Sequence, residues 1–562
     1  MRSTSTAFYL LGLLLACGTL CAQFPQVYFR GVVNAASYMS PGLPGGAIAR
    51  GSVFSVFGSN LGPASSPSLA FPLQTTLGNI SITVTSGATV VNAIPIYVSP
   101  TQINAIMPSN APLGLASLTV RTSNTHSNPA PVRITDSSFG IFTASGGGSG
   151  PGILQNYISA DTQPINSLQQ AAMPGQVLTL WGTGLGAVTF PDNVAPTPGN
   201  LPVQTEVFVG GKSARLLYNG RSPCCSGVDQ IVLQIPGDAP NGCWVPVYVR
   251  TKGANVSNFV TIAISPDGSP CTEPSNALPT ALINGGNIGM VMAARVAVHH
   301  DVGVDSTNDG VTDLLGAYFA QEKTGPFNFN PMFSLPPAGT CTSYTFAGEF
   351  PNGAGGFLPG MTPPTGRALN AGPITLSSGG APPSNQTATS LAPGMFLTFL
   401  GGSISTIPGV LNTSFLAPGN FTTSGAAGND AGSFQANFAM AAPPGWTNRD
   451  QLSVITRNKG FTATWTGIAN GNTVFVSGGG VDLPANSTGL FLCIAKPGDT
   501  SLTVPPDVLA NVPPTHTRLI QSRSAVYVGQ WPIANPVSFN ASGLDFGWLL
   551  GVGVSGKTVM FQ

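Results

Sequence analysis

Oxygen-bearing side chains between positions 305 and 313 have the spacing closest to a known chemical site. Asp305, Thr307, Asp309 and Asp313 occupy positions 1, 3, 5 and 9 of a loop that has Gly310 at position 6. A hard cation such as calcium is held by oxygen ligands in this pattern, and the glycine permits a sharp turn. Position 12 is also a glycine, whereas a complete calcium-binding loop has a glutamate there. An Asx-rich turn that leads into a helix is therefore the first interpretation, and a calcium site is the alternative.

The four histidines give little support for catalysis or for a transition-metal site. His299 and His300 are adjacent, and neighbouring residues of a strand point to opposite faces of the sheet. No Gly-x-Ser-x-Gly turn introduces a helix, and no pair of acidic residues can be nominated for glycoside hydrolysis. We therefore expect a protein that is not an enzyme and that needs no cofactor besides the calcium considered above.

Six tryptophans could offer flat faces for stacking against sugars. Trp181 aligns with Phe57 in an internal repeat, and Trp465 lies in an alternating strand, so both are expected in the core. Trp446 and Trp531 are flanked by turn residues and are the better candidates for exposed, ligand-binding tryptophans. A core or rim position is the ordinary interpretation for each of them, because aromatic side chains usually bury most of their surface.

Cysteine usage predicts disulfides rather than a metal site. Four cysteines lie within one region and two lie far downstream, and no Cys-x-x-Cys motif occurs. The first four allow three pairings, among which the sequence does not choose. A bond between the last two would join the early and late parts of the C-terminal half. The predicted disulfide cysteines are Cys224, Cys225, Cys243, Cys271, Cys341 and Cys493.

The first 22 residues have the features of a secretion signal. Arg2 supplies a positive charge, Ala7–Ala16 is apolar but short for a membrane span, and Ala22 is a plausible cleavage residue. A lipid anchor at Cys17 is the less favoured alternative, because the residue two positions before it fits a lipoprotein signal poorly. No other segment has a transmembrane pattern. We expect a bacterial protein that is secreted or displayed at the cell surface.

Composition excludes several classes of partner. Only 7% of the 562 residues are charged, against roughly 25% in ordinary soluble domains. Lys and Arg together number 20, as do Asp and Glu, and there is no dense basic run. Nucleic acids and anionic membrane surfaces are therefore poor partner candidates. The abundant glycine and proline favour many short strands joined by turns, which is typical of an all-β protein.

An internal repeat predicts the architecture of the first half. Ser52–Gly62 and Gln176–Gly186 are both alternating apolar strands that end in a glycine turn. The offset between matching positions is 124 at Gly58 and 128 at Gln102, and it reaches 130 at the Ser-Asn pair of 127–128. Small loop insertions between copies of one fold explain this drift.

The strand pattern predicts two immunoglobulin-like β-sandwiches, which we name module 1 (residues 27–143) and module 2 (residues 153–266). The Gly/Ser-rich segment 144–152 is expected to be a flexible linker between them. Residues 280–562 are expected to be β-rich, with one or two further sandwiches and a short helix at Thr312–Lys323.

Two features of the repeat resemble known families. The alternating strand followed by Gly-x-x-Leu-Gly looks like the opening strand of IPT/TIG immunoglobulin-like modules. Gly31–Ser37 (GVVNAAS), Tyr97–Asn104 (YVSPTQIN) and Asp229–Ile231 (DQI) resemble the Solibacter-type family of uncharacterised secreted β-sandwich proteins from acidobacteria. The resemblance covers residues 31–266 and implies export and a sandwich fold. It implies no activity that can be transferred residue by residue.

These patterns together predict an exported, non-catalytic surface or matrix protein that binds through β-sandwich faces and loops. Its partner would be an extracellular protein or a polysaccharide. The alternative is a carbohydrate-binding protein that uses Trp446 or Trp531. A third hypothesis is an enzyme whose site lies in the C-terminal half and has no recognisable motif.

Overall fold

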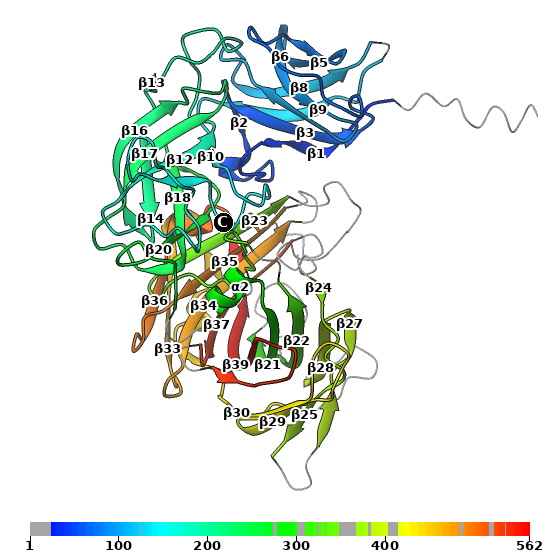
Figure 1. Ribbon diagram of the computed structural model, residues 1–562, viewed down its shortest axis with the longest axis vertical. Helices are drawn as coiled ribbons and strands as arrows, with labels where there is room; N and C mark the ends of the chain where they lie inside the picture. Colours follow the sequence, from blue (N-terminus) through cyan, green and yellow to red (C-terminus); the bar gives the residue numbers. More distant parts are fainter. Residues whose placement is uncertain are drawn as a thin grey trace, which may run out of the picture.

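The computed structural model shows an all-β protein in which module 2 lies between module 1 and the C-terminal half (Figure 1). Cys17 and the rest of the predicted signal segment lie outside the described residues, as do Asp305, Thr307 and Asp309. Among the described residues, no helix has the length and apolar character that spanning a membrane requires. The structure describes residues 24–123, 125–273, 278–299, 310–322, 325–331, 333–347, 367–379, 384–402, 414–482, 487–515, 522–533 and 536–562.

Module 1 is a sandwich whose two layers are joined by one strand, β6 (Thr89–Val98). The first half of β6 pairs with β5, and its second half pairs with β7, so the strand passes from one layer to the other. Val56 and Ile103 from one layer pack against Ile82 and Leu118 from the other. The strand order is β1 (Gln26–Asn34), β3 (Val53–Ser59), β7 (Gln102–Ile106), β6, β5 (Ile80–Ser86), β8 (Gly114–Arg121), β9 (Ala130–Thr135) and β2 (Ile48–Ala49), with β4 (Thr76–Leu77) on β5.

Module 2 repeats this plan with two separate sheets. Leu180 and Ile231 from the first sheet pack against Val207 and Val247 from the second. The first sheet has the order β10 (Gly140–Ile141), β12 (Val177–Thr183), β17 (Asp229–Gln234), β16 (Arg215–Arg221) and β13 (Gly199–Asn200), with β11 (Leu154–Asn156) on β12. The second has the order β15 (Lys212–Ser213), β14 (Thr205–Val209), β18 (Gly242–Thr251) and β19 (Asn255–Val256), with β20 (Val260–Ile264) on β18.

The segment that joins the modules differs from the sequence-based expectation. β10 lies within the range assigned to module 1, but it pairs with β12 of module 2. The predicted flexible linker 144–152 folds back on itself, since the Ala144 N–H donates to the Pro151 carbonyl. A side chain at Gly148 would collide with the backbone of Ser37, so the loop packs directly on module 1. Gly148 therefore serves close packing between the loop and module 1.

Both modules contain the same pair of backbone contacts at a Ser-Asn dipeptide, which we call the Ser-Asn clamp. Asn128 accepts the N–H of Val27 at 2.8 Å and donates to its carbonyl at 3.1 Å. Asn258 forms the same two bonds with Ile141, at 2.8 and 2.9 Å. The serine before each asparagine accepts a backbone N–H from the adjacent strand, β8 or β18. The two clamps show that the repeat extends to side-chain contacts.

The C-terminal half is built on one long sheet. β39 (Phe546–Thr558) runs parallel to β21 (Asn287–His299) in its middle, although the two are far apart in the sequence. The order within the described residues is β23 (Cys341–Ala347), β35 (Ser487–Ile494), β34 (Thr473–Asp482), β37 (Ser522–Trp531), β39, β21, β22 (Gly310–Gln321), β28 (Met395–Gly402) and β27 (Ser390–Ala392), with β24 (Arg367–Ala368) on β22 and β38 (Val537–Ser538) on β39.

Smaller sheets pack on this long sheet. One packs over β21 and β22, and a second covers β34, β35 and β37. The first comprises β26 (Asn385–Thr387), β25 (Ile374–Ser378), β29 (Gly419–Gly425) and β30 (Phe434–Met440), and the second β31 (Gly445–Trp446), β33 (Phe461–Thr466) and β36 (Ser501–Val504). A pair of short strands, β32 (Val454–Ile455) and β40 (Met560–Phe561), and the short helices η2 (Pro44–Gly46), α2 (Leu278–Asn284), η3 (Arg449–Gln451), η4 (Arg457–Lys459) and α3 (Pro506–Leu509) complete the described elements.

The predicted helix at Thr312–Lys323 is wrong, because residues 312–321 belong to strand β22. Leu315, Ala317 and Phe319 are buried, and the residues between them are half-buried. Burial therefore alternates with the two-residue period of a strand. β22 also pairs with β21 along its whole length. Tertiary pairing therefore decides the structure of a segment whose local sequence is compatible with a helix.

Module 2 and the C-terminal half share hydrophobic cores. Trp244 of module 2 packs in one cluster with Met290 and Trp548 of the long sheet. Tyr248 and Phe259 belong to a second cluster that also contains residues of β34 and β35. The burial of large aromatic side chains on both sides makes this contact a continuous interior rather than a loose junction.

Candidate functional site

The structure gives Asp313 a structural role. It lies on β22 and is fully buried, and its Oδ2 accepts the N–H groups of Phe415 at 2.6 Å and Leu416 at 2.8 Å. The predicted turn leading into a helix is therefore wrong at this position. The other three predicted calcium ligands lie outside the described residues. Within the described ranges, no group of three or more His, Cys, Asp or Glu side chains could hold a metal ion.

Trp446 and Trp531 are not exposed, so the prediction that they offer open stacking faces is wrong. Their exposed fractions are 7% and 9%. Trp446 lies opposite Trp465 between β31 and β33, and Trp531 packs against Phe475 with ring centroids 4.6 Å apart. The two tryptophans also belong to different clusters. Turn residues flank both side chains in the sequence, but the chain on either side folds over the rings.

All six predicted cysteines form disulfides. Cys243 pairs with Cys271, beside the contact between module 2 and the C-terminal half. Cys341 and Cys493 join β23 to β35. The remaining bond links the adjacent residues Cys224 and Cys225 in the hairpin between β16 and β17. Both of these side chains are exposed, whereas Cys243, Cys271 and Cys493 are buried.

An open aromatic face lies on the first sheet of module 2. Leu178 and Leu180 of β12 point into the core, so the alternating residue Trp181 points to the opposite face and is half-buried. The Trp181 Nε1–H donates to Gln155 Oε1 at 2.7 Å, and Gln155 in turn donates to the Gln163 carbonyl at 3.1 Å. These two bonds fix the plane of the indole ring before any ligand arrives.

Trp181 is the first member of a row that crosses the sheet. Gln230 lies directly opposite it on β17, Gly220 lies opposite Gln230 on β16, and Asn200 lies opposite Gly220 on β13. With strands about 4.8 Å apart, the row is about 14 Å long. The Gln230 side chain makes no hydrogen bond with any residue that the structure describes. We call Trp181, Gln230, Gly220 and Asn200 the cross-strand row.

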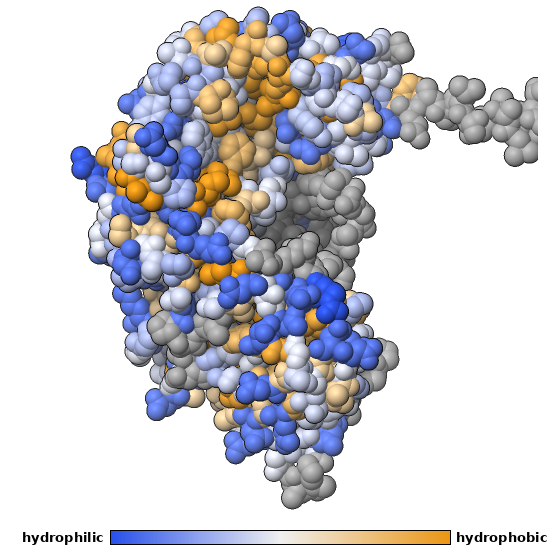
Figure 2. Space-filling model, in the orientation of Figure 1, coloured by the Kyte–Doolittle hydropathy of each residue, from blue (hydrophilic) through white to orange (hydrophobic). Residues whose placement is uncertain are grey.

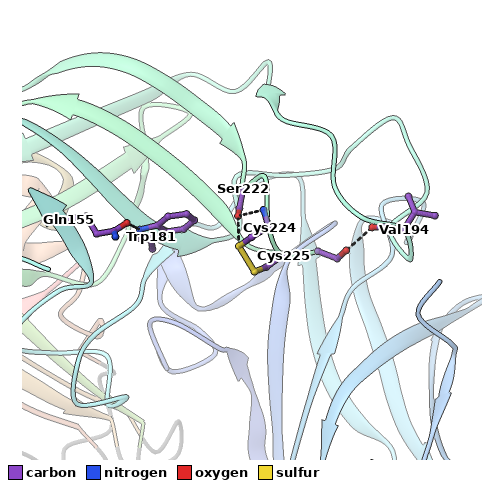
Figure 3. Close-up of a disulfide and its surroundings, with 7 residues drawn as sticks. Gln155, Trp181, Val194, Ser222, Cys224 and Cys225 are labelled. Atoms are coloured by element: carbon purple, nitrogen blue, oxygen red, sulfur yellow. Dashed lines mark hydrogen bonds between the residues drawn. A yellow bond between two sulfur atoms is a disulfide. The ribbon is translucent and has the colours of Figure 1, made fainter. Parts of the chain in front are cut away.

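The hairpin that carries Cys224 and Cys225 begins next to this row. Figure 3 shows the Trp181 ring between Gln155 and the hairpin, with the disulfide beyond Ser222. The Ser222 Oγ accepts the N–H of Cys224 at 3.1 Å and lies 3.1 Å from its sulfur. The hairpin that holds the disulfide therefore joins the two strands that supply Gly220 and Gln230 of the row.

A buried ion pair closes the base of the hairpin. Arg221 Nη1 and Asp229 Oδ1 are 2.7 Å apart, and both side chains are almost completely buried. The other carboxylate oxygen accepts the N–H groups of Gly184 and Leu185, each at 2.7 Å. Burial raises the pKa of Asp229, and the guanidinium and the two N–H groups oppose that rise. These contacts hold the base of the hairpin to the first residues after β12.

Module 1 supports the same hairpin from the other side. The Thr183 hydroxyl donates to the Gly227 carbonyl at 2.6 Å and accepts the N–H of Val53 of module 1 at 2.8 Å. A side chain at Gly227 would meet Val53 and Ile106, so this part of the hairpin lies directly on module 1. The Ser226 hydroxyl donates to the Val194 carbonyl at 2.8 Å (Figure 3). The position of the disulfide is therefore set by both modules.

Charged contacts also connect module 2 with its neighbours. Arg250 lies 2.9 Å from Glu206 and 2.9 Å from Asp507 of α3, and its hydrogen bond lowers the pKa of Glu206. Asp136 pairs with Lys252 at 3.0 Å, and this hydrogen bond lowers the pKa of Asp136. These carboxylates remain ionised at neutral pH and contribute to the alignment of the modules.

Two other surfaces are candidates for contacts. A cleft of about 450 Å³ lies between module 2 and the C-terminal half, beside the Cys243–Cys271 bond. Figure 2 shows apolar patches on the viewed face where module 1 and module 2 adjoin. The loops that meet there contain the exposed side chains Phe71 and Val194. The cleft is lined in part by Asn241, Ser269, Thr272, Leu335, Pro337 and Pro497.

The sequence contains a signal for the hairpin that motif searching missed. The repeat offset grows from 124 at Gly58 to 128 at Gln102. In module 1, Val98 pairs with Ile103, whereas in module 2 the corresponding pair, Asn219 and Ile231, encloses a much longer loop. The insertion that causes the drift is the segment that holds the adjacent cysteines. The half-buried position of Trp181, by contrast, could not be derived from its alignment with a buried phenylalanine.

Comparison with known proteins assigns no family. No family model and no curated protein matches the chain. Among solved structures, a tetra-tandem repeat from the extending region of a large adhesion protein is 12% identical and covers 93% of this chain and 98% of its own, with a TM-score of 0.13.

Two further solved structures align with parts of the chain. SGBP-B of the Bacteroides ovatus mixed-linkage glucan utilization locus, in complex with a mixed-linkage heptasaccharide, is 12% identical and covers 39% of this chain and 45% of its own (TM-score 0.19). The plexin A4 extracellular region is 8% identical and covers 85% of this chain and 29% of its own (TM-score 0.15). At such low TM-scores these alignments assign neither a ligand nor an activity.

Proposed function

We propose that the chain is an exported, non-catalytic surface or matrix protein that binds its partner through faces and loops of its β-sandwiches. The observation that supports this best is the fixed position of module 2. The Arg221–Asp229 hairpin rests on module 1, and the other side of module 2 shares two cores with the C-terminal half. A face that is ordered before binding loses less conformational entropy when a partner docks.

Two further features agree with export. Three disulfides are expected in an oxidising compartment and are rare in the cytosol. Because few residues are charged, the polar part of the surface consists largely of neutral groups. Such a surface suits contact with extracellular proteins or polysaccharides. Trp446 and Trp531 are not part of this proposal, because both are buried.

Export can be tested by expressing the full chain in a bacterial host with a C-terminal tag. We expect the chain in the medium or accessible to protease added to intact cells. A Cys17→Ser variant is the matched control, because it removes the acceptor for a lipid anchor but leaves the predicted cleavage after Ala22. Retention of the full-length chain in the cytoplasm would contradict the proposal.

Binding without turnover can be tested with the purified full chain. Cell envelopes and extracellular matrix from the source bacterium are sedimented with the protein, and the bound fraction is measured. The same materials are then incubated with excess protein, and released sugars and peptides are quantified. We expect saturable binding and no product above a heat-denatured control. Product release that follows the protein concentration would show an enzyme instead.

A further inference from the structure

We propose that module 2 contains a glycan-binding site in which the Trp181 indole and the Cys224–Cys225 disulfide form the apolar contacts for a neutral sugar chain. The inference names a ligand class and a location for the binding function proposed above, and it rests on that function. Four observations support it: the fixed indole, the exposed disulfide, the uncharged row beside them, and the lack of the indole and the disulfide in module 1.

The indole has the geometry of a stacking platform. Trp181 is half-buried, and its Nε1–H is already satisfied by Gln155 at 2.7 Å. The ring therefore offers its face rather than its hydrogen-bond donor to a ligand. The C–H groups on one side of a pyranose ring pack well against such a face, and an aromatic ring supplies large contact area at little entropic cost.

The disulfide provides a second apolar surface. Both cysteines are exposed and, because their sulfurs are bonded to each other, neither sulfur carries a hydrogen to donate. Sulfur is polarisable and makes favourable dispersion contacts with apolar groups. The hairpin is fixed through Ser222, Ser226 and Gly227, so the disulfide is held in place as firmly as the indole.

The groups between and beside these surfaces are neutral and polar. The Gln230 amide makes no hydrogen bond with any described residue, and Asn200 is exposed at the far end of the cross-strand row. Amides can both donate to and accept from sugar hydroxyls. The ions at the hairpin base, Arg221 and Asp229, are buried and paired with each other. An uncharged sugar therefore fits this face better than an acidic one.

Module 1 shows that these features are not a by-product of the fold. The position that matches Trp181 is Phe57, which is buried and packs near Tyr38 with ring centroids 6.0 Å apart. The module 1 hairpin closes directly between Val98 and Ile103 and contains no cysteine. The half-buried indole and the disulfide hairpin therefore occur together in one copy and are both absent from the other.

The test uses the full chain and a defined panel of neutral polysaccharides, namely cellulose, xylan, galactomannan and dextran, with polygalacturonate as the acidic counterpart. Affinity electrophoresis or sedimentation gives dissociation constants. We expect at least one neutral polymer to bind, with Trp181→Ala weakening binding about tenfold or more. Cys224→Ser with Cys225→Ser, and Gln230→Ala, should each weaken it about threefold. Tyr97→Ala is the matched control, an exposed aromatic of module 1 whose loss should change nothing.

Each other outcome overturns the inference. These outcomes are no binding to any neutral polymer, preference for polygalacturonate, or unchanged binding by Trp181→Ala and Gln230→Ala. Gln230→Ala removes a half-buried amide and guards against misfolding of the tryptophan variant, and melting temperatures confirm that both variants fold. If cell envelopes still bind the wild-type chain while the neutral polymers do not, the general proposal survives and the partner is a protein or another polymer. If the envelopes do not bind either, both proposals fail.

Discussion

Module 1 and module 2 have the same strand plan, but they differ in the length of one hairpin and in the burial of one aromatic side chain. Both contain a Ser-Asn clamp with nearly equal hydrogen-bond distances. In module 1 the hairpin after β6 is short, and Phe57 is covered. In module 2 the equivalent hairpin is longer, contains a disulfide and a buried ion pair, and lies beside an open indole. The shared contacts maintain the scaffold, while the insertion alters the surface.

The difference shows what a long hairpin requires. An insertion at the end of a sandwich exposes backbone groups and loses conformational entropy when it becomes ordered. Module 2 compensates with Arg221 and Asp229 at the base and with the Ser226 and Gly227 contacts along the loop. If this explanation is right, removing these supports should affect module 2 strongly, and matched changes in module 1 should have little effect.

The largest effect is expected from Arg221→Ala. The substitution leaves the Asp229 carboxylate buried without its counter-ion, which costs about 3–5 kcal/mol of stability. Urea denaturation followed by tryptophan fluorescence measures the change in the free energy of unfolding. Arg133→Ala, at an exposed position on β9 of module 1, is the control and should stay within about 0.5 kcal/mol of wild type. Equal effects of the two substitutions would show that the ion pair does not support the hairpin.

Disulfide removal should separate a structural bond from a surface bond. Replacing Cys243 and Cys271 by alanine opens a bond that spans 28 residues within a hydrophobic cluster, and we expect a loss of about 3 kcal/mol. Replacing Cys224 and Cys225 by serine opens a bond between adjacent residues and should cost less than about 1 kcal/mol, since it closes almost no loop. Thermal denaturation under non-reducing conditions compares the two variants. A larger loss from the serine variant would contradict this assignment.

The two Ser-Asn clamps should also differ in strength. Asn258 is buried and makes a third backbone bond, to the Gly148 carbonyl at 2.8 Å, whereas Asn128 is exposed. We expect Asn258→Ala to cost about 2–3 kcal/mol, because it leaves buried backbone groups unpaired, and Asn128→Ala about 1 kcal/mol or less, because water replaces the lost bonds. Hydrogen exchange at Ile141 and Val27 reports each clamp directly. Similar protection losses at both sites would refute the comparison.

The smallest effect is expected to be a loss of folding stability at acidic pH. The pKa of Asp136 is lowered by its hydrogen bond from Lys252, and the pKa of Glu206 is lowered by Arg250. A lowered folded-state pKa contributes stability above the unfolded value and loses it as the pH falls through the folded value. Stability should therefore decline below about pH 4, by less than about 1 kcal/mol per contact because these side chains are partly exposed. Asp136→Asn should flatten part of this decline between pH 5 and pH 3, and an unchanged pH profile would exclude this contact as a contributor.

The sequence predicts the strands of the two modules well, because hydrophobic alternation is a local property. β3 falls within the predicted strand Ser52–Gly62, and β12 falls within Gln176–Gly186. The repeat also identifies both Ser-Asn pairs that form the clamps. Sequence reasoning fails where distant pairing decides the outcome. Residues 312–321 of the predicted helix form a strand because β21 lies beside them, a fact that no local pattern contains.

The candidate site is less predictable than the fold, for a related reason. Burial of a tryptophan depends on what the rest of the chain places over it. Trp446 and Trp531 have turn residues beside them and are nevertheless covered, whereas Trp181 has a buried counterpart in the repeat and is open. The adjacent cysteines were expected to form disulfides, but the sequence left three pairings open. Only the structure shows that Cys224 and Cys225 are bonded to each other beside the indole.

The central place of β39 in the long sheet has a consequence for the order of events during biogenesis. Its two neighbours, β21 and β37, have no partner along these edges until residues 546–558 have been synthesised. Module 1 has a hydrophobic core of its own, but the C-terminal sheet must wait, with open strand edges that can pair with other chains. A parallel pairing between such distant segments is also slow to form. Truncation before β39 should therefore yield aggregates in place of a shorter sheet.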